Sequence, residues 1–371
     1  MREQIALFYR RLALDGCRFW YDYLLMLVLI PCGYVYGFIG QFRVWLYQRG
    51  FLSTSRAHVP VICVGNLVVG GTGKTPVVSW ILDCLRQRGY RTAVISRGYA
   101  SSAGADPPVK ARQVKIEGAH DRAHAAATYG DEPVLLALRH PETIVVVAPR
   151  RVDGVRYIQR HHEVDVIILD DAFQHLALER DLDLVLLDAR KPLGNGHVLP
   201  AGLMRERRSA LQRADMLLMT RYHPGVVIPE MNLKHGEPKE TVHVSSRLAH
   251  YALDLSGARI PLSDLSHLRL GAFAGIADPD DFFASLHRYA IQPFTTVPLV
   301  DHVSYTAKKV HYIHTRCEGV DAFITTEKDA VKLDPKLFTL PCYYVPLEIE
   351  PVELEKLEQA LLGVLTLPKT R

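Results

Sequence analysis

A glycine-rich turn at residues 70–75, Gly-Gly-Thr-Gly-Lys-Thr, contains the residue types that most directly suggest chemistry. It follows an apolar, β-branched run at residues 59–64 and precedes a helical pattern at residues 77–85. A strand, a glycine-rich turn and a helix in this order form a loop whose backbone N–H groups and helix N-terminus bind phosphate. Lys74 would reach the β- and γ-phosphates of a nucleotide, and the Thr75 hydroxyl would hold Mg²⁺.

This loop departs from the usual phosphate-loop pattern at one position. The pattern G-x-x-x-x-G-K-[ST] requires a glycine five residues before Gly73, and Val68 stands there. A glycine-rich turn without a ligand is the alternative interpretation, but Gly-Lys-Thr at a strand-to-helix junction favours the phosphate loop. The candidate nucleotide contacts in this loop are Val68, Val69, Gly70, Gly71, Thr72, Gly73, Lys74 and Thr75.

Two adjacent carboxylates, Asp170 and Asp171, end a hydrophobic run at residues 166–169. At the end of such a strand, P-loop proteins place the acid that holds Mg²⁺ directly or through water. Adjacent carboxylates repel each other unless a cation or hydrogen-bond donors compensate. The pair therefore predicts a metal site, and capping of the following turn is the alternative for one of the two.

Three further polar residues are candidates whose type alone leaves two roles open. Asp131 follows Gly130 at the start of a helical pattern, where it would stay ionised as a functional carboxylate or as an N-cap. His302 follows a strand in the C-terminal part of the chain, where a lone histidine is more often a surface or capping residue. Arg205 ends a loop containing Gly, Pro and Asn, and would either clamp a phosphate or lie on the surface.

The order of the expected elements indicates the fold class. Continuous apolar runs alternate with helical patterns, which is typical of a parallel sheet covered on both faces. Ligands of such sheets bind beyond the carboxyl ends of the strands, where the polar clusters fall. We expect an α/β protein with a P-loop NTPase-like parallel-sheet domain at residues 56–225. A hydrophobic helical segment at residues 1–55 would precede it, and a smaller α/β domain at residues 226–371 would close over the cleft.

Composition narrows the class of partner and the compartment. The net charge of +4 over 371 residues is mild, and the sequence contains no basic block that would indicate a nucleic-acid partner. The six cysteines are scattered without a C-x-x-C pair, which argues for a reducing compartment and against disulfides or zinc.

The N-terminal segment between residues 23 and 40 has no charged residue. Its length approaches that of a membrane span, but prolines and glycines interrupt it, and aromatic and basic residues lie on both sides. An interfacial or shallowly inserted helix is the favoured interpretation. A true membrane span and the core helix of a soluble domain remain the alternatives.

Several longer motifs in fixed order resemble those of the tetraacyldisaccharide 4′-kinase family of lipid A biosynthesis. They are Val64-Gly65-Asn66 leading into Gly-Gly-Thr-Gly-Lys-Thr-Pro, Ser96-Arg97-Gly98-Tyr99, Gly130-Asp131-Glu132-Pro133, Asp170-Asp171-Ala172-Phe173-Gln174-His175, Leu199-Pro200-Ala201-Gly202 with Arg205-Glu206, and Thr326-Glu327-Lys328-Asp329-Ala330-Val331-Lys332-Leu333. That family also lacks the first glycine of the loop. Where it usually has Pro-Leu-Arg-Glu-Pro, this chain has Leu203-Met204-Arg205-Glu206-Arg207.

The resemblance implies a kinase that transfers the γ-phosphoryl group of ATP to the 4′-hydroxyl of a lipid A precursor, a tetraacyldisaccharide 1-phosphate, in lipid IVA synthesis. It implies that Asp131 takes the hydroxyl proton while His302, from the second domain, orients it. Lys74 and Arg205 would neutralise phosphate charge, and Gln174 would join the nucleotide contacts. The implied Mg²⁺ ligands are Thr75, Asp170, Asp171 and Glu206.

The resemblance also implies a location, the cytoplasmic face of the inner membrane, where the N-terminal segment would dock. It implies no obligate protein partner and no nucleic acid. A nucleotide-driven switch or metal-insertion ATPase with the same loop variant is the alternative function, and a soluble kinase for a small metabolite is a third. The uncharged N-terminal segment argues against the third.

Overall fold

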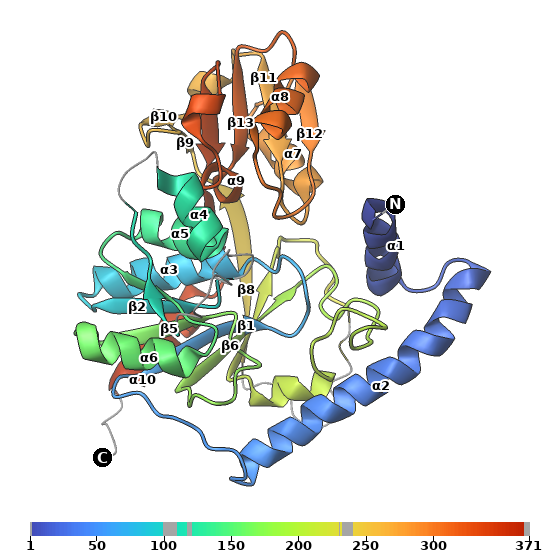
Figure 1. The fold of residues 1–371 in the computed structure, drawn as a ribbon, viewed down its shortest axis with the longest axis vertical. Coiled ribbons are helices and arrows are strands. Elements are labelled where there is room, and N and C mark those ends of the chain that lie inside the picture. Colours follow the sequence, from blue (N-terminus) through green and yellow to red (C-terminus); the bar gives the residue numbers. More distant parts are fainter. Residues whose placement is uncertain (1, 99–109, 117–120, 230, 232–239, 367–371) are drawn as a thin grey trace. The chain divides into compact units, whose positions relative to one another are not determined.

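The structure, a computed structural model, describes residues 2–98, 110–116, 121–229, 231 and 240–366 (Figure 1). Its contacts divide the chain into two compact units, neither of which is one continuous segment. The first unit comprises Met1–Lys74, Asp165–Ser245 and Glu350–Arg371, and the second comprises Thr75–Val164 and Ser246–Ile349. The domain boundaries expected after residues 55 and 225 remain a prediction.

The first unit contains a mainly parallel run of strands in the order β15-β8-β7-β6-β1-β5. Their bounds are β1 Val61–Asn66, β5 Val166–Asp170, β6 Leu182–Asp188, β7 Met216–Thr220, β8 Glu240–Leu248 and β15 Leu347–Pro351, and η2 Arg208–Arg213 and α10 Leu354–Thr366 belong to the same part of the chain. Strands β1 and β5 are buried at every residue, as expected of apolar strands covered on both faces. Their parallel register pairs Val64 with Asp170, so the carboxyl ends of both strands lie at the same edge.

Two helices precede β1 in the first unit: α1 (Arg2–Asp15) and α2 (Trp20–Gln48), the long blue helix of Figure 1. Helix α2 has 29 residues and is therefore about 44 Å long. Its buried residues include Met26, which packs with Leu12 of α1 and with Ala201. By length and composition alone, α2 could cross a membrane, although only 17% of its most apolar stretch is buried.

The second unit contains the strands β2, β4 and β3, and a separate six-stranded sheet in the order β10-β9-β14-β13-β11-β12. The strands are β2 Thr92–Ser96, β3 Arg112–Gln113, β4 Ile144–Val147, β9 Tyr251–Asp254, β10 Arg259–Pro261, β11 Leu270–Ala274, β12 Thr295–Pro298, β13 Ala322–Thr326 and β14 Cys342–Val345. The helices are α3 Lys74–Gln87, whose first residue belongs to the first unit, α4 Arg122–Tyr129, α5 Asp131–Arg139, α6 Arg151–His161, α7 Pro279–His287, α8 Ala307–Arg316, α9 Glu327–Ala330, η3 Leu262–Leu265 and η4 Pro335–Leu337.

Alternation along β11 explains why the six-stranded sheet has helices on both faces. Ala272 and Ala274 pack in one buried cluster with Phe283 of α7, whereas Phe273 packs in the other with Ile313 of α8. Successive side chains of a strand point to opposite faces, so one strand contributes to both cores.

The expected α/β class, with mostly parallel sheets and a long apolar N-terminal helix, is confirmed. Tyr99 of the Ser96-Arg97-Gly98-Tyr99 motif lies outside the described residues. Strands β9 and β10 were not expected from the sequence. Strand β10 is at the edge of the six-stranded sheet, and β9 lies between β10 and β14, antiparallel to both. With four and three residues, β9 and β10 are too short for a clear alternation of apolar and polar residues.

Candidate active site

The phosphate loop runs from the end of β1 to the first residue of α3, Lys74, and its own side chains hold its shape. The amide Nδ2 of Asn66 donates to the Val68 carbonyl at 2.6 Å and to the Thr72 hydroxyl at 3.2 Å. The Thr220 hydroxyl, at the end of β7, donates to the Thr72 carbonyl at 2.9 Å. A loop held from both sides in this way is organised before any phosphate arrives.

The valine at the first-glycine position has a structural explanation. The segment before the glycines is paired with the loop that carries Arg205: Val69 N–H donates to the Leu203 carbonyl, and Arg205 N–H donates to the Leu67 carbonyl, both at 2.8 Å. Val68 forms an antiparallel bridge with Met204 and is 7% exposed. An extended, buried position favours a β-branched residue over glycine.

Lys74, Arg205 and Asp171 lie together at this edge of the first unit. An Nη1 of Arg205 donates to Oδ1 of Asp171 at 2.8 Å, and Nζ of Lys74 lies 3.9 Å from the same oxygen. Asp171 has a φ of 49°, in the left-handed region that non-glycine residues rarely adopt. Gly65 makes the close approach of this turn possible, because a Cβ there would lie 2.6 Å from Cβ of Phe173.

Gln174 connects three segments of the first unit. Its Nε2 donates to the Asn66 carbonyl at 2.9 Å, and its Oε1 lies 3.4 Å from Nη1 of Arg205. Its carbonyl accepts a hydrogen bond from Nη2 of Arg43 in helix α2 at 2.7 Å. The expected nucleotide contact Gln174 therefore lies at the phosphate loop and also contacts the long apolar helix.

The four expected metal ligands differ in their surroundings. Asp170 is fully buried at the end of β5, and Asp171 is shared by two cations. Both oxygens of Glu206 are engaged by the guanidinium of Arg213, at 2.8 and 3.1 Å. Thr75 is assigned to the second unit. The described residues contain no cluster of three or more His, Cys, Asp or Glu side chains that could hold a metal by themselves.

These side chains suit Mg²⁺, which takes part of its ligands from water and substrate, better than a metal ion whose ligands all come from protein side chains. Mg²⁺ usually keeps several waters and binds through one or two carboxylates together with substrate phosphates. Asp170 and Asp171 meet that requirement at the end of β5, beside the phosphate loop. Glu206 would have to leave Arg213 in order to ligate a metal.

Asp131 and His302 are in contact within the second unit. Nδ1 of His302 lies 3.0 Å from Oδ2 of Asp131, which is the first residue of helix α5 and 6% exposed. His302 has a φ of 58°, and its backbone N–H is held by Oδ1 of Asp301 at 3.0 Å. Both residues belong to one compact unit by their contacts, and their expected division between two domains remains a prediction.

The charges around this pair shift both pKa values. Burial raises the pKa of Asp131, but the hydrogen bond with His302 and the ammonium groups of Lys328 and Lys332 together bring it below its ordinary value. The hydrogen bond with Asp131 raises the pKa of His302 above its ordinary value, against the opposing effects of burial and of Lys328. The carboxylate and the imidazole therefore favour an ion pair as the pH falls towards mild acidity.

Lys328 and Lys332 belong to the motif at residues 326–333, but their residue types alone indicate no role. Nζ of Lys328 lies 3.4 Å from Nε2 of His302, and Nζ of Lys332 lies 4.0 Å from Oδ2 of Asp131. Lys328 lies in helix α9, and Lys332 follows it by four residues. This spacing, which puts two side chains on the same face of a helix, is the one sequence signal that could have placed the two lysines together. Thr220 was also missed, because a threonine ending a buried strand has no distinctive pattern.

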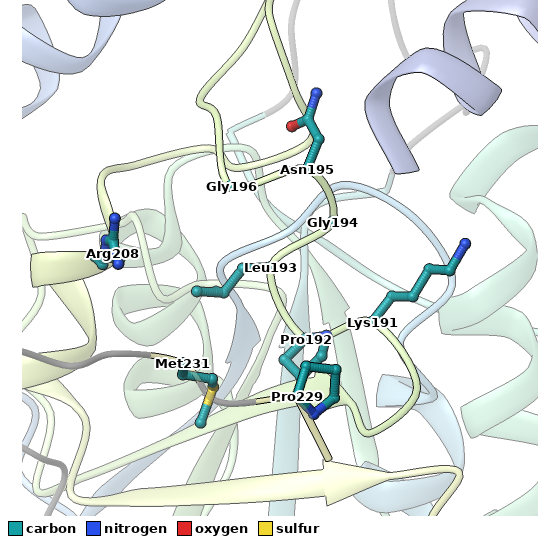
Figure 2. A pocket seen from close by; sticks show the side chains of 9 residues that line it. All are labelled: Lys191, Pro192, Leu193, Gly194, Asn195, Gly196, Arg208, Pro229 and Met231. Carbon is teal, nitrogen blue, oxygen red and sulfur yellow. The ribbon is translucent and has the colours of Figure 1, made fainter. Parts of the chain in front are cut away.

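A separate pocket of the first unit has a volume of ≈ 240 Å³. It is lined by Lys191, Pro192, Leu193, Gly194, Asn195, Gly196, Arg208, Pro229 and Met231 (Figure 2). None of the expected site residues lines it. Lys191, at its edge, is paired with Asp15 of helix α1, so this pocket adjoins the N-terminal helices and not the phosphate loop.

Comparison with known proteins gives matches to one family of kinases along nearly the whole chain. The sequence model of the LpxK family, described as tetraacyldisaccharide-1-P 4′-kinase, matches residues 25–366. A tetraacyldisaccharide 4′-kinase of Syntrophotalea carbinolica is 43% identical over 364 residues, which cover 98% of this chain and 99% of the relative. One from Geobacter sulfurreducens is 39% identical over 338 residues, covering 89% of this chain and 91% of the relative.

A solved structure shows the same similarity in three dimensions. The crystal structure of an LpxK from Aquifex aeolicus in complex with ATP matches with a TM-score of 0.73 and 28% sequence identity. The match covers 92% of this chain and 99% of that chain.

Proposed function

The chain belongs to the tetraacyldisaccharide 4′-kinase family, and from this premise we propose how its residues divide the work of phosphoryl transfer. It is an ATP-dependent kinase of lipid A biosynthesis that phosphorylates the 4′ position of a tetraacyldisaccharide 1-phosphate. Phosphoryl transfer depends mainly on positioning and on neutralising charge. Separate groups of side chains position the reacting groups and neutralise the phosphate charge.

Lys74 and Arg205 bind the phosphates of ATP, with the backbone of residues 68–75 and Gln174 as further nucleotide contacts. Support comes from the carboxylate of Asp171, which both cations approach. Two cations that share one carboxylate can exchange it for a phosphate oxygen, and the Asp171 carboxylate that they release would then be available to Mg²⁺.

Thr75, Asp170, Asp171 and Glu206 would hold Mg²⁺, which supplies positive charge at the phosphates when it is bound. The buried carboxylate of Asp170 beside Asp171 supports the first part of this assignment. Glu206 is the weakest member of the set because Arg213 engages both of its oxygens.

Asp131 acts as the general base for the acceptor hydroxyl, and His302 orients it. The observation that carries the proposal is the 3.0 Å contact between Nδ1 of His302 and Oδ2 of Asp131. A lowered pKa keeps Asp131 ionised at neutral pH and therefore able to accept a proton. The left-handed backbone of His302 is consistent with a residue held in place for function.

Helix α2 lies on the membrane surface at the cytoplasmic face of the inner membrane, where the lipid-linked acceptor is found. Its outward side chains include Trp20, Leu27, Val35 and Ile39, all at least 61% exposed. Its other side contacts the first unit: a Cβ on Gly33 would lie 3.1 Å from the Val198 carbonyl, and Gln41 contacts Ser209. A helix with one face on a folded unit and one apolar face exposed fits an interfacial position better than a span.

The switch or metal-insertion ATPase considered from the sequence is not proposed, because kinase relatives match along 89–98% of the chain. The expected closure of the C-terminal domain over the cleft, and the absence of an obligate protein partner, remain predictions.

The experiment that tests the base assignment is a double-mutant cycle on kcat with a lipid A precursor in mixed micelles. We expect Asp131→Ala to lower kcat by about 10²–10⁴-fold, because general-base catalysis contributes that much. His302→Ala should cost less, and the double variant should be little worse than Asp131→Ala, because residues that act as a unit are non-additive. Fully multiplicative effects would show two independent roles and would refute the pair.

A further inference from the structure

The two ring nitrogens of His302 face groups of opposite charge. Nδ1 lies 3.0 Å from Oδ2 of Asp131, and Nε2 lies 3.4 Å from Nζ of Lys328. Lys328 is the second residue of helix α9, which directly follows strand β13, and His302 lies in the loop after β12. A carboxylate and an ammonium therefore contact the same imidazole from two separate parts of the second unit.

These partners select one form of the ring by elementary hydrogen-bond chemistry. An ionised carboxylate can only accept, so Nδ1 must carry the proton that it donates to Asp131. A lysine ammonium can only donate, so Nε2 must offer its lone pair. Only the neutral imidazole with its proton on Nδ1 satisfies both contacts. The doubly protonated ring would place an N–H against the ammonium of Lys328.

Lys328 is held in its charged form by two carboxylates. Its Nζ lies 3.4 Å from Oδ1 of Asp301 and 3.7 Å from Oε1 of Glu132. Burial lowers the pKa of Lys328, but Glu132, Asp301 and Asp131 together raise it above its ordinary value. The lysine therefore acts as a fixed positive charge beside Nε2 at every pH at which the enzyme would work.

Other charges act on the ring in the opposite sense. Oδ2 of Asp301 lies 3.8 Å from Nε2 of His302 and, like Asp131, favours the imidazolium. Lys332 lies beside Asp131 and is paired with Asp329 at 3.0 Å, so it acts on the carboxylate of the pair. Among these groups, Lys328 is the cation in direct contact with His302.

We propose that Lys328 is a positioning residue that selects the neutral, Nδ1-protonated form of His302 and so keeps the Asp131–His302 pair competent at neutral pH. In this form His302 orients Asp131 without forming an ion pair with it. Protonation of Nε2 would convert the contact to an ion pair, which stabilises the carboxylate and weakens it as a base. The inference rests on the proposed role of Asp131 and His302.

The proposal has a direct consequence for the pH dependence. When Lys328 is replaced by a neutral side chain, Asp131 and Asp301 act on the imidazole unopposed. The protonated form then persists to higher pH, and the acid limb of kcat should move upward. A unit charge about 4 Å away shifts a pKa by roughly three quarters of a unit at the dielectric constant of bulk water, and by more where water is partly excluded.

The test is nuclear magnetic resonance of the full chain in detergent micelles with ¹⁵N-labelled histidine, the His302 signals being assigned by their loss in His302→Gln. The parent should show Nδ1 protonated and Nε2 unprotonated at pH 8. Detection of the opposite tautomer in the parent overturns the proposal without any variant at Lys328.

The variant arm uses Lys328→Met, which keeps the length of the side chain and removes its charge. The pKa of His302 and the acid limb of kcat should both rise by about one unit or more. Lys328→Arg should restore both, and Lys308→Met, at an exposed lysine of helix α8, should leave both unchanged. An unchanged His302 titration in folded Lys328→Met refutes the role of Lys328.

A failure of the role proposed for Lys328 can be distinguished from a failure of the assignment of Asp131 as the general base. If Asp131 is not the base, Asp131→Asn keeps parental turnover, whatever the titration of His302 shows. If only the role of Lys328 is wrong, Asp131→Asn has a low turnover, while Lys328→Met leaves the pKa of His302 unchanged.

Discussion

At the scale of single residues, the candidate site combines backbone strain with shared charge. Asp171 and His302 are two of the four non-glycine residues with positive φ among the described residues. Asp171 is also in contact with the guanidinium of Arg205, and His302 with the carboxylate of Asp131. Strained backbone persists only where the surroundings determine it strongly, and such residues cluster at functional sites.

The Asp131–His302 pair should make stability depend on pH in a defined window. The lowered pKa of Asp131 stabilises the fold above its unfolded value, near 4, and this contribution is lost as pH falls through the lower folded value. The raised pKa of His302 stabilises the fold below its unfolded value, near 6.5, and this contribution is lost as pH rises through the higher folded value. Both contributions are present between about pH 4 and 6.5.

His302→Gln should therefore lower the melting temperature more at pH 5.5 than at pH 9. Thermal unfolding at the two pH values measures this difference, with His267→Gln at an exposed histidine as the matched control. Equal losses at both pH values would show that the contact contributes no ionic stabilisation.

Sequence reasoning identified residues whose roles lie in local patterns, and it missed residues that depend on tertiary contact. Lys74 and Asp171 follow strands in recognisable order, so their neighbourhood could be predicted from β1 and β5. Lys328 meets His302 only because the turn after β13 lies beside the loop after β12, and no local pattern carries that information. The pairing of Glu206 with Arg213 was hidden for the same reason.

At the scale of elements, the phosphate loop is built from two segments and not from one. The extended stretch at Val68 pairs with the loop of Met204, which carries Arg205 next to it. In the sequence, Val68 is a departure from the phosphate-loop pattern. In the structure, Val68 is an extended residue whose pairing with Met204 places Arg205 beside the phosphate loop.

Restoring the consensus glycine should therefore not help this loop. We expect Val68→Gly to lower stability by about 0.5–1 kcal/mol or more, because glycine loses more backbone entropy and a buried side chain is removed. Affinity for ATP should not increase. Calorimetry of unfolding and of ATP binding measures both, with Val227→Gly at an exposed valine as the control. Tighter ATP binding by Val68→Gly would contradict the role given to this pairing.

The apolar composition of helix α2 predicted a hydrophobic helix, but the sequence did not show which of its faces packs against the protein. Its apolar composition left three interpretations open, and the proposal of an interfacial helix draws on the contacts of Gly33 and Gln41 with the first unit. Periodicity was uninformative because both the packed and the exposed faces are apolar.

Replacing outward side chains of α2 should reduce membrane binding without unfolding the protein. We expect serine substitution of Leu27, Val35 and Ile39, which are 61–70% exposed, to weaken sedimentation with anionic vesicles about tenfold or more. The melting temperature should stay near the parental value, because these side chains make few internal contacts. The control replaces three other exposed apolar residues with serine: Val227, Phe294 and Val352.

Unchanged vesicle binding in the α2 variant would place the membrane contact elsewhere. Equal loss in the control would show that the effect reflects overall surface hydrophobicity and not this helix.

At the scale of the whole molecule, the candidate residues are distributed over two compact units. Lys74, Arg205 and Asp171 belong to the first unit, and Asp131 and His302 belong to the second. Each group is held by contacts within its own unit. A substitution in one group should therefore leave the structure of the other intact, so binding of ATP and transfer of its phosphoryl group can be impaired separately.

The central claim is that these two groups of residues serve one reaction. The most direct test is single-turnover transfer of phosphate from γ-labelled ATP to the lipid acceptor, with the ATP affinity measured on the same proteins. Lys74→Ala should lose most of its ATP affinity and its transfer. Asp131→Asn should bind ATP as the parent does, yet transfer the label about 10²–10⁴-fold more slowly. Transfer by Asp131→Asn at the parental rate, in a protein that binds ATP normally, would contradict the account.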